Sequence, residues 1–181
     1  MPVDISKLTT NDWLLAGGAL GMLVFGLFVD WISVDVGFGS VSGGNAFDFF
    51  FTGTIPWLLV VAAGVVTVLR TQGKIGENLP WNLLVVAATG LGAILLILRV
   101  LINPGFDGAG RGMGMYLSLL SALAAGAGGF LSFQAAGGTL SDLTDVDKIK
   151  GAFDQGGQGG QSDQGGQGGG EMPPPPPPPT A

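Results

Sequence analysis

The chain has 181 residues, of which 11% are charged and 47% apolar, and its formal net charge is −6 at pH 7. It contains no Cys and no His, which removes thiol nucleophiles, disulfides and the usual zinc sites, so we predict no catalytic residue, cofactor or metal. The seven Lys and Arg residues are too few for a nucleic-acid surface, whereas the high apolar fraction is typical of a protein embedded in a lipid bilayer.

The first membrane span is predicted over about residues 12–32. Trp13 and Trp31 would lie about 27 Å apart along a helix that rises 1.5 Å per residue, which places an indole at each membrane interface. Gly17 and Gly21 form a GxxxG pair, a pattern that lets helices approach closely in lipid. A cleaved signal peptide is the alternative. The preceding residues are weakly basic and no A-x-A-like cleavage site follows, so we expect an uncleaved helix.

The loop after the first span has two parts. Residues 31–42 alternate apolar with polar or glycine residues, which predicts a half-buried strand or hairpin. The next part is rich in phenylalanine around a single acid, Asp48, and suggests a segment at the lipid interface. The loop has two interpretations: a cap over a ligand held by the bundle, or an apolar cover that packs on the helix ends.

Two patterns near this loop carry a resemblance, Phe28-Val29-Asp30-Trp31 and Ser42-Gly43-Gly44-Asn45-Ala46-Phe47. In them the chain resembles a group of small, uncharacterised four-helix integral membrane proteins of actinobacteria. That group often shows an aromatic residue, Pro and Trp, followed by Ser-Gly-x-x-Ala-Phe, and this chain departs from it by having Asp30 where Pro is usual. The resemblance implies a four-helix layout and no activity.

The second and third spans are predicted over about residues 55–71 and 81–102. Each begins with a Pro-Trp pair, which starts a helix and places an indole at the interface. Ala88 and Gly92 form the small pair of the third span, and Arg99 in its last turn is expected to extend to the headgroups. The predicted interface anchors are thus Trp13, Trp31, Trp57 and Trp81.

The fourth span, about residues 113–134, carries no charge and is the predicted packing helix. Its small residues recur every four positions in two neighbouring rows on one side of a helix: Gly114, Ser118, Ala122 and Gly126, and Ser121, Ala125 and Gly129. In lipid, close backbone approach and van der Waals contact hold helices together, and a smooth face permits both. The same face would support a homo-oligomer. The alternative is that Gly and Ala are simply abundant in this chain, which has 34 Gly.

After the last span the chain becomes polar. Residues 135–153 have apolar positions three to four apart, which suggests a short amphipathic helix at the membrane surface. Asp142, Asp145 and Asp147 lack the pattern of a calcium loop, so we interpret them as a solvated face. Residues 154–181 hold Gly and Gln repeats and then seven prolines, and we predict a disordered tail. The candidate partner-binding residues are Pro173, Pro174, Pro175, Pro176, Pro177, Pro178 and Pro179.

The predicted fold is therefore an all-α membrane protein, a four-transmembrane-helix bundle over residues 12–134 with a disordered C-terminal tail. Five basic residues would fall on one side of the membrane and two on the other, and the positive-inside rule then makes residues 1–11 and the C-terminal tail cytoplasmic. This would place the chain in a bacterial cytoplasmic membrane as a multi-pass protein.

No acid or base falls in the middle of a span, and ion-coupled transporters usually need one there. The leading hypothesis is a non-enzymatic membrane protein whose bundle is an anchor or an oligomerisation unit. Its cytoplasmic Pro-rich tail would bind a protein, because a preformed polyproline helix loses little entropy on docking. The alternative for the tail is a plain spacer. The alternative for the protein is a small transporter or an accessory subunit of a transport complex.

Overall fold

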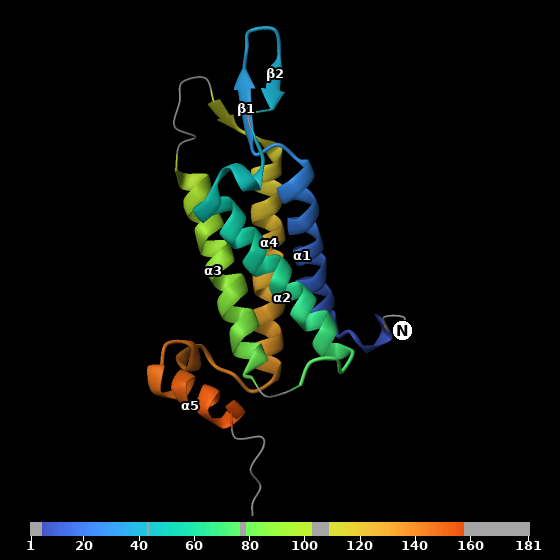
Figure 1. Ribbon diagram of the computed structural model, residues 1–181, viewed down its shortest axis with the longest axis vertical. Helices are drawn as coiled ribbons and strands as arrows, with labels where there is room; N and C mark the ends of the chain where they lie inside the picture. The colour runs from blue at the N-terminus through green and yellow to red at the C-terminus, as the bar shows by residue number, and fades with distance from the viewer. Residues whose placement is uncertain (1–4, 43, 77–78, 103–108, 158–181) are drawn as a thin grey trace, which may run out of the picture.

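Four long helices run up and down in a bundle in the computed structural model, which describes residues 5–42, 44–76, 79–102 and 109–157 (Figure 1). They are α1 (Thr10–Phe28), α2 (Ile55–Thr71), α3 (Trp81–Leu101) and α4 (Met113–Ala135). A π-helical turn, η3 (Phe50–Thr54), runs directly into α2, so that the apolar helix spans residues 50–71. All four helices are long and apolar enough to cross a membrane, which confirms the four predicted apolar helices.

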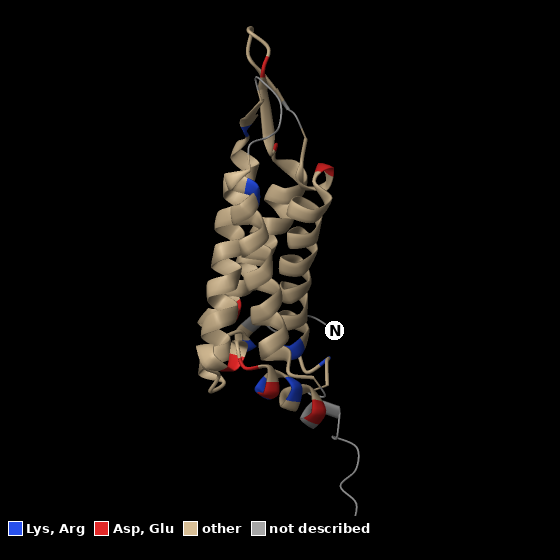
Figure 2. Cartoon of the chain, turned by 90° about the vertical axis from the view of Figure 1, so that its left-hand side faces the viewer, with Lys and Arg blue, Asp and Glu red and all other residues tan. Residues whose placement is uncertain are grey.

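The helices form a ring in which each packs on two neighbours: α1 on α2 and α4, and α3 on α2 and α4. Side chains of the ring pack in two buried clusters, and the largest fully buried residues in them include Leu15, Met22, Leu96 and Met115. The charged residues lie toward the two ends of the bundle and leave its middle uncharged (Figure 2). This distribution suits a bundle whose middle faces hydrocarbon.

A small antiparallel sheet sits at one end of the bundle, which we call the hairpin end, and it corrects the prediction of an all-α fold. Strand β1 (Ile32–Asp35) pairs with β2 (Ser40–Ser42) in a hairpin, and the predicted period-2 stretch is indeed extended. Strand β3 (Ala109–Arg111) joins the other edge of β1, giving the order β2-β1-β3. The predicted Gly-rich linker before the fourth span thus contributes a strand.

The first helix ends at Phe28, four residues before the predicted end of the first span. The reason lies in the residues that follow. The backbone N–H of Trp31 donates to Gly44 O at 2.8 Å, and Gly112 N donates to Trp31 O at 2.8 Å, so this stretch exchanges helical hydrogen bonds for contacts with the loops. Ile32 then enters β1.

The opposite end, which we call the α5 end, carries the residues after α4. A short turn of 3-10 helix, η4 (Leu140–Leu143), leads into α5 (Val146–Gly157), which lies across the end of the bundle in Figure 1. An amphipathic helix was predicted within residues 135–153, and α5 extends past that range, so residues 154–157 are helical rather than part of the tail. The predicted disorder and the seven prolines, Pro173–Pro179, fall outside the described residues.

Candidate functional site

The candidate functional site is the surface at the α5 end of the bundle. It lies between helix α5 and the neighbouring ends of α2, α3 and α4. The helix α5 presents apolar side chains that remain uncovered: Val146 is 74% exposed, and Phe153 and the preceding Leu140 are exposed as well. A largely apolar groove of about 420 Å³ separates Ile149 and Phe153 from the α3 surface at Leu84 and Leu91. An apolar helix face beside a helix that is long and apolar enough to cross a membrane is suited to lying in the lipid interface.

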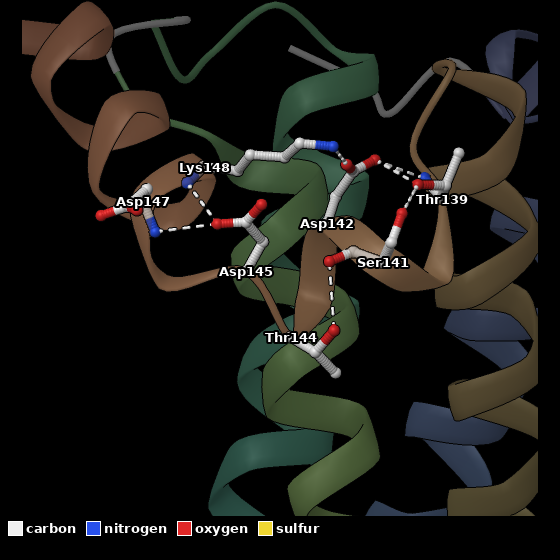
Figure 3. A network of polar contacts seen from close by, with 7 residues as sticks. All are labelled: Thr139, Ser141, Asp142, Thr144, Asp145, Asp147 and Lys148. Atoms are coloured by element: carbon white, nitrogen blue, oxygen red, sulfur yellow. Dashed lines mark hydrogen bonds and ion pairs between the residues drawn. The ribbon is translucent and has the colours of Figure 1, made fainter.

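Acidic side chains hold the turn before α5 in shape. Asp142 accepts hydrogen bonds from Thr139 N and Thr139 Oγ1, both at 2.7 Å, and forms an ion pair with Lys148 Nζ at 2.7 Å (Figure 3). Asp145 caps the start of α5, because its Oδ1 accepts from Asp147 N and Lys148 N. Two of the three acids considered for calcium therefore serve to cap and brace local structure.

The ion pair changes the titration of both of its members. The hydrogen bond from Lys148, followed by those from Thr139, lowers the pKa of Asp142 from 3.8 to about 2. The same carboxylate raises the pKa of Lys148 above its usual value. Both side chains reach solvent, so the pair fixes the position of α5 relative to η4 more than it stabilises the whole fold.

Two polar pockets open at the α5 end. One, of about 510 Å³, lies between α5 and the bundle and is lined by charged side chains that include Arg70, Asp142 and Lys148. The other, of about 480 Å³, lies among α1, α2, α3 and α4. Arg70 Nη1 donates to Asn82 Oδ1, and both residues line both pockets, so this hydrogen bond forms a common wall. Ser132 Oγ lines the second pocket and is buried without a hydrogen-bond partner.

The predicted packing face of α4 lies mostly inside the bundle. Ser118 and Ala122 are fully buried, and a Cβ on Gly114 would come within 2.3 Å of the carbonyl oxygen of Val29. Gly126 is the exception, since its nearest neighbour would be Thr89 O at 3.9 Å. The row formed by Ser121, Ala125 and Gly129 is buried as well.

The small pair predicted on α1 is partly wrong. Gly17 is exposed and a Cβ there would meet nothing within 4 Å, whereas Gly21 faces the side chain of Ser121. The close approach is made by Gly18, where a Cβ would lie 2.5 Å from Ala125 N and 2.5 Å from Ser121 O. Because Gly17 and Gly18 are adjacent, the local pattern alone does not choose between the two faces.

On α3, Gly92 is buried against α2, where a Cβ would lie 2.8 Å from Val60 Cγ2. Ala88 is half-buried and packs beside the cluster of Leu15, Ala63 and Val85. Gly128 on α4 was not predicted from the sequence, although it packs against the backbone of α1, with Leu15 N 2.5 Å from an added Cβ. Its signal was the pair Gly128-Gly129, of which only the second lies in the predicted rows.

The four tryptophans are not equivalent. Trp13 is 51% exposed, and Trp57 and Trp81 are half-buried, so these three retain surface for the lipid interface. Trp31 has no exposed surface, and its Nε1 donates to Phe25 O at 3.2 Å inside the bundle. The prediction that Trp31 is an interface anchor is therefore corrected: it is a core residue.

Comparisons with family models, with curated proteins and with solved structures found no match to this chain.

Proposed function

We propose that this chain is a non-enzymatic protein of the bacterial cytoplasmic membrane whose bundle holds a cytoplasmic Pro-rich segment at the membrane surface for binding by a protein. The observation that carries the proposal is the arrangement at the α5 end. There the described chain begins at residue 5, α4 ends and α5 follows, so both ends of the described chain lie at the same end of the bundle (Figure 1).

Charge supports the orientation. Lys7, Arg70, Lys74, Lys148 and Lys150 belong to the α5 end, and Arg99 and Arg111 to the hairpin end. Under the positive-inside rule the α5 end faces the cytoplasm. Reporter fusions at Asn45, Gly76, Gly108 and Gly151 should accordingly report outside, inside, outside and inside. A periplasmic signal at Gly151 would exclude the proposed orientation.

The bundle has the features of an anchor. Gly18, Gly114 and Gly128 bring the backbones of α1 and α4 into direct contact over most of their length, which maximises the dispersion contact that holds helices together in lipid. The exposed apolar face of α5 would add a second attachment to the same membrane surface. The Pro-rich segment would then be presented a short distance from the headgroups.

The test is a capture experiment on the full chain in native membranes. The sharpest variant replaces the seven prolines of residues 173–179 by Ala, which keeps the length and the net charge and removes the polyproline conformation. Under the proposal, the wild-type protein captures a cytoplasmic partner after crosslinking and the Ala variant loses it. A variant that replaces the seven glycines of residues 159–170 by Ser, all of them after α5, serves as the matched control and should keep the partner. Equal capture by all three chains would leave the tail as a spacer.

One observation favours the transporter alternative. The 480 Å³ pocket opens among all four helices and has a polar wall of Arg70, Asn82 and the unpartnered Ser132 hydroxyl. A pocket with this polar wall would suit a polar solute. Arg70→Gln would then abolish uptake while residues 154–181 would be dispensable, whereas an anchor needs those residues and tolerates the change at Arg70.

A further inference from the structure

A positive charge is buried at the hairpin end of the bundle. Arg99, in the last turn of α3, is only 6% exposed, although the sequence predicts that it extends to the headgroups. Its guanidinium carbon lies 3.6 Å from the centroid of the Phe49 ring, so an aromatic face covers one side of the cation. The Arg99 side chain thus packs against Phe49, the residue directly before η3, instead of extending to the surface.

Two of the three guanidinium nitrogens of Arg99 lack a hydrogen-bond partner. Nε and Nη2 of Arg99 are both buried without a partner. A guanidinium stays charged in proteins, and its N–H donors point outward in the plane of the group. The Phe49 ring stacks on the flat face, so it leaves those in-plane donors unsatisfied. A buried cation is ordinarily paired, because an aromatic contact does not replace both hydration and a counter-charge.

Within the described residues no carboxylate forms an ion pair with Arg99; the one such pair there joins Asp142 to Lys148 at the opposite end. Two acids of the hairpin end accept backbone hydrogen bonds: Asp48 from Asn45 N at 2.7 Å and Asp35 from Gly37 N at 2.9 Å. Arg111 adds a second positive charge that acts on Arg99. An anion between these two positive charges would offset their mutual repulsion.

We propose that Arg99 is the centre of a binding site for a phosphate oxyanion, and that the phosphodiester of a phospholipid headgroup is its occupant. The position of the residue supports a lipid source. Arg99 is two residues from the end of a membrane-crossing helix, where headgroups lie. Exposed apolar side chains flank it on both packed segments, Phe50 and Phe51 on η3 and Leu101 and Ile102 after it on α3, and these suit acyl chains.

The geometry also assigns a role to Phe49. Its carbonyl oxygen accepts from both Gly53 N at 2.6 Å and Thr54 N at 3.0 Å, and the second bond, from five residues on, is that of a π-helical turn. Such turns are rare and occur frequently at functional sites. The turn directs the Phe49 ring over the guanidinium, so a change in this side chain alters access to the site without removing the charge.

The test measures melting of the full-length protein in a non-ionic detergent with three additives: phosphatidylglycerol, diacylglycerol with the same acyl chains, and inorganic phosphate. Phosphatidylglycerol at about one hundred times its Kd should raise the melting temperature by about 5 to 10 °C. Diacylglycerol should not, because it lacks the phosphate. An equal shift with inorganic phosphate would confirm the oxyanion site and assign it a free anion instead of a lipid. An equal shift with diacylglycerol would overturn the proposal.

The variants separate binding from a structural role. Arg99→Met should abolish the shift, Arg99→Lys should retain part of it, and Lys74→Met, which removes an exposed cation at the other end, should leave it unchanged. Without lipid, Arg99→Met should melt at or above the wild-type temperature, because it removes an unpaired buried charge. A variant that melts lower in detergent and keeps the full lipid shift would refute the site. If Arg99→Met does not fold, mass spectrometry of the wild-type protein decides: about tenfold preferential retention of phosphatidylglycerol over diacylglycerol is expected, and equal retention would refute the site.

Discussion

Gly18 of α1 and Ala125 of α4 touch through their backbones: a Cβ added to Gly18 would lie 2.5 Å from the nitrogen of Ala125 and 3.0 Å from its Cα. No side chain can move aside to make room, because the obstructing atoms belong to a helix backbone. At this point the contact between α1 and α4 therefore depends on the absence of a Cβ at residue 18. It is the point at which the packing of the bundle is most directly testable.

Gly18→Ala should destabilise the protein by about 1 to 3 kcal/mol, the usual cost of overpacking a tight contact. The matched control is Gly17→Ala on the adjacent residue, where an added Cβ meets nothing. That change should be neutral or stabilising by up to about 1 kcal/mol, because Ala favours helix more than Gly does. Unfolding in detergent with increasing SDS measures both variants. Equal loss of stability in the two would show that α1 is rotated from the position described.

A second pair of glycines tests the orientation of α4. Gly128→Ala would push a Cβ to within 2.5 Å of Leu15 N, whereas Gly126→Ala finds its nearest neighbour at 3.9 Å. We expect the change at Gly128 to cost about 1 to 3 kcal/mol and the change at Gly126 to be tolerated. Ala122→Leu, at a fully buried position, should destabilise as Gly128→Ala does. Melting temperatures in detergent give the ranking, and a Gly126 variant less stable than the Gly128 variant would contradict it.

The fluorescence of single-tryptophan variants should separate Trp31 from Trp13. With the other tryptophans replaced by Phe, Trp13 is expected to be quenched by brominated lipids, because half of its surface is exposed. Trp31 should be protected, because it has no exposed surface and its indole N–H is bonded to Phe25 O. Equal quenching of the two would place Trp31 at the lipid surface, as its spacing in the sequence first suggests.

The contact between η4 and α5 should persist over a wide pH range. The pKa of Asp142 is lowered to about 2. The stability that its carboxylate gives to the contact is therefore fully present above about pH 4, the ordinary carboxyl pKa, and is lost as the pH falls through 2. The pKa of Lys148 is raised, so its contribution is complete below about pH 10 and is lost only at higher pH. Carboxyl carbon NMR of Asp142 measures the titration. Lys148→Met should raise the pKa of Asp142, and an unchanged midpoint would exclude the ion pair as the cause.

The sequence predicts the four helices well and their contacts less well. Long apolar segments bounded by Pro-Trp pairs define α2 and α3 almost to the residue, because both signals are local. Strand β3 escapes prediction, because residues 109–111 have no alternating pattern and are extended only through pairing with β1. The same limit applies to Gly17 and Gly18, where the partner helix decides which glycine is used.

At the candidate sites, too, local features can be predicted from the sequence and contacts between distant segments cannot. The amphipathic pattern of α5 is visible in the sequence, since it depends on residues only a few positions apart. The burial of Arg99 is not, because the Phe49 ring that covers it comes from a loop fifty residues earlier in the chain. Nor is the bond between Arg70 and Asn82, which links two helices across a turn.

The contact between α1 and α4 also determines how the protein would respond to mechanical load. It extends from Gly128 beside Asn11 at the α5 end to Gly114 beside Val29 at the hairpin end, and the pairing of β1 with β3 fastens the far ends of the same two helices. A partner pulling on the chain beyond α5 would draw α4 along its own axis. All contacts between α1 and α4 would then be sheared at the same time. A pull parallel to the two helices resists force far better than one that opens the contacts one at a time.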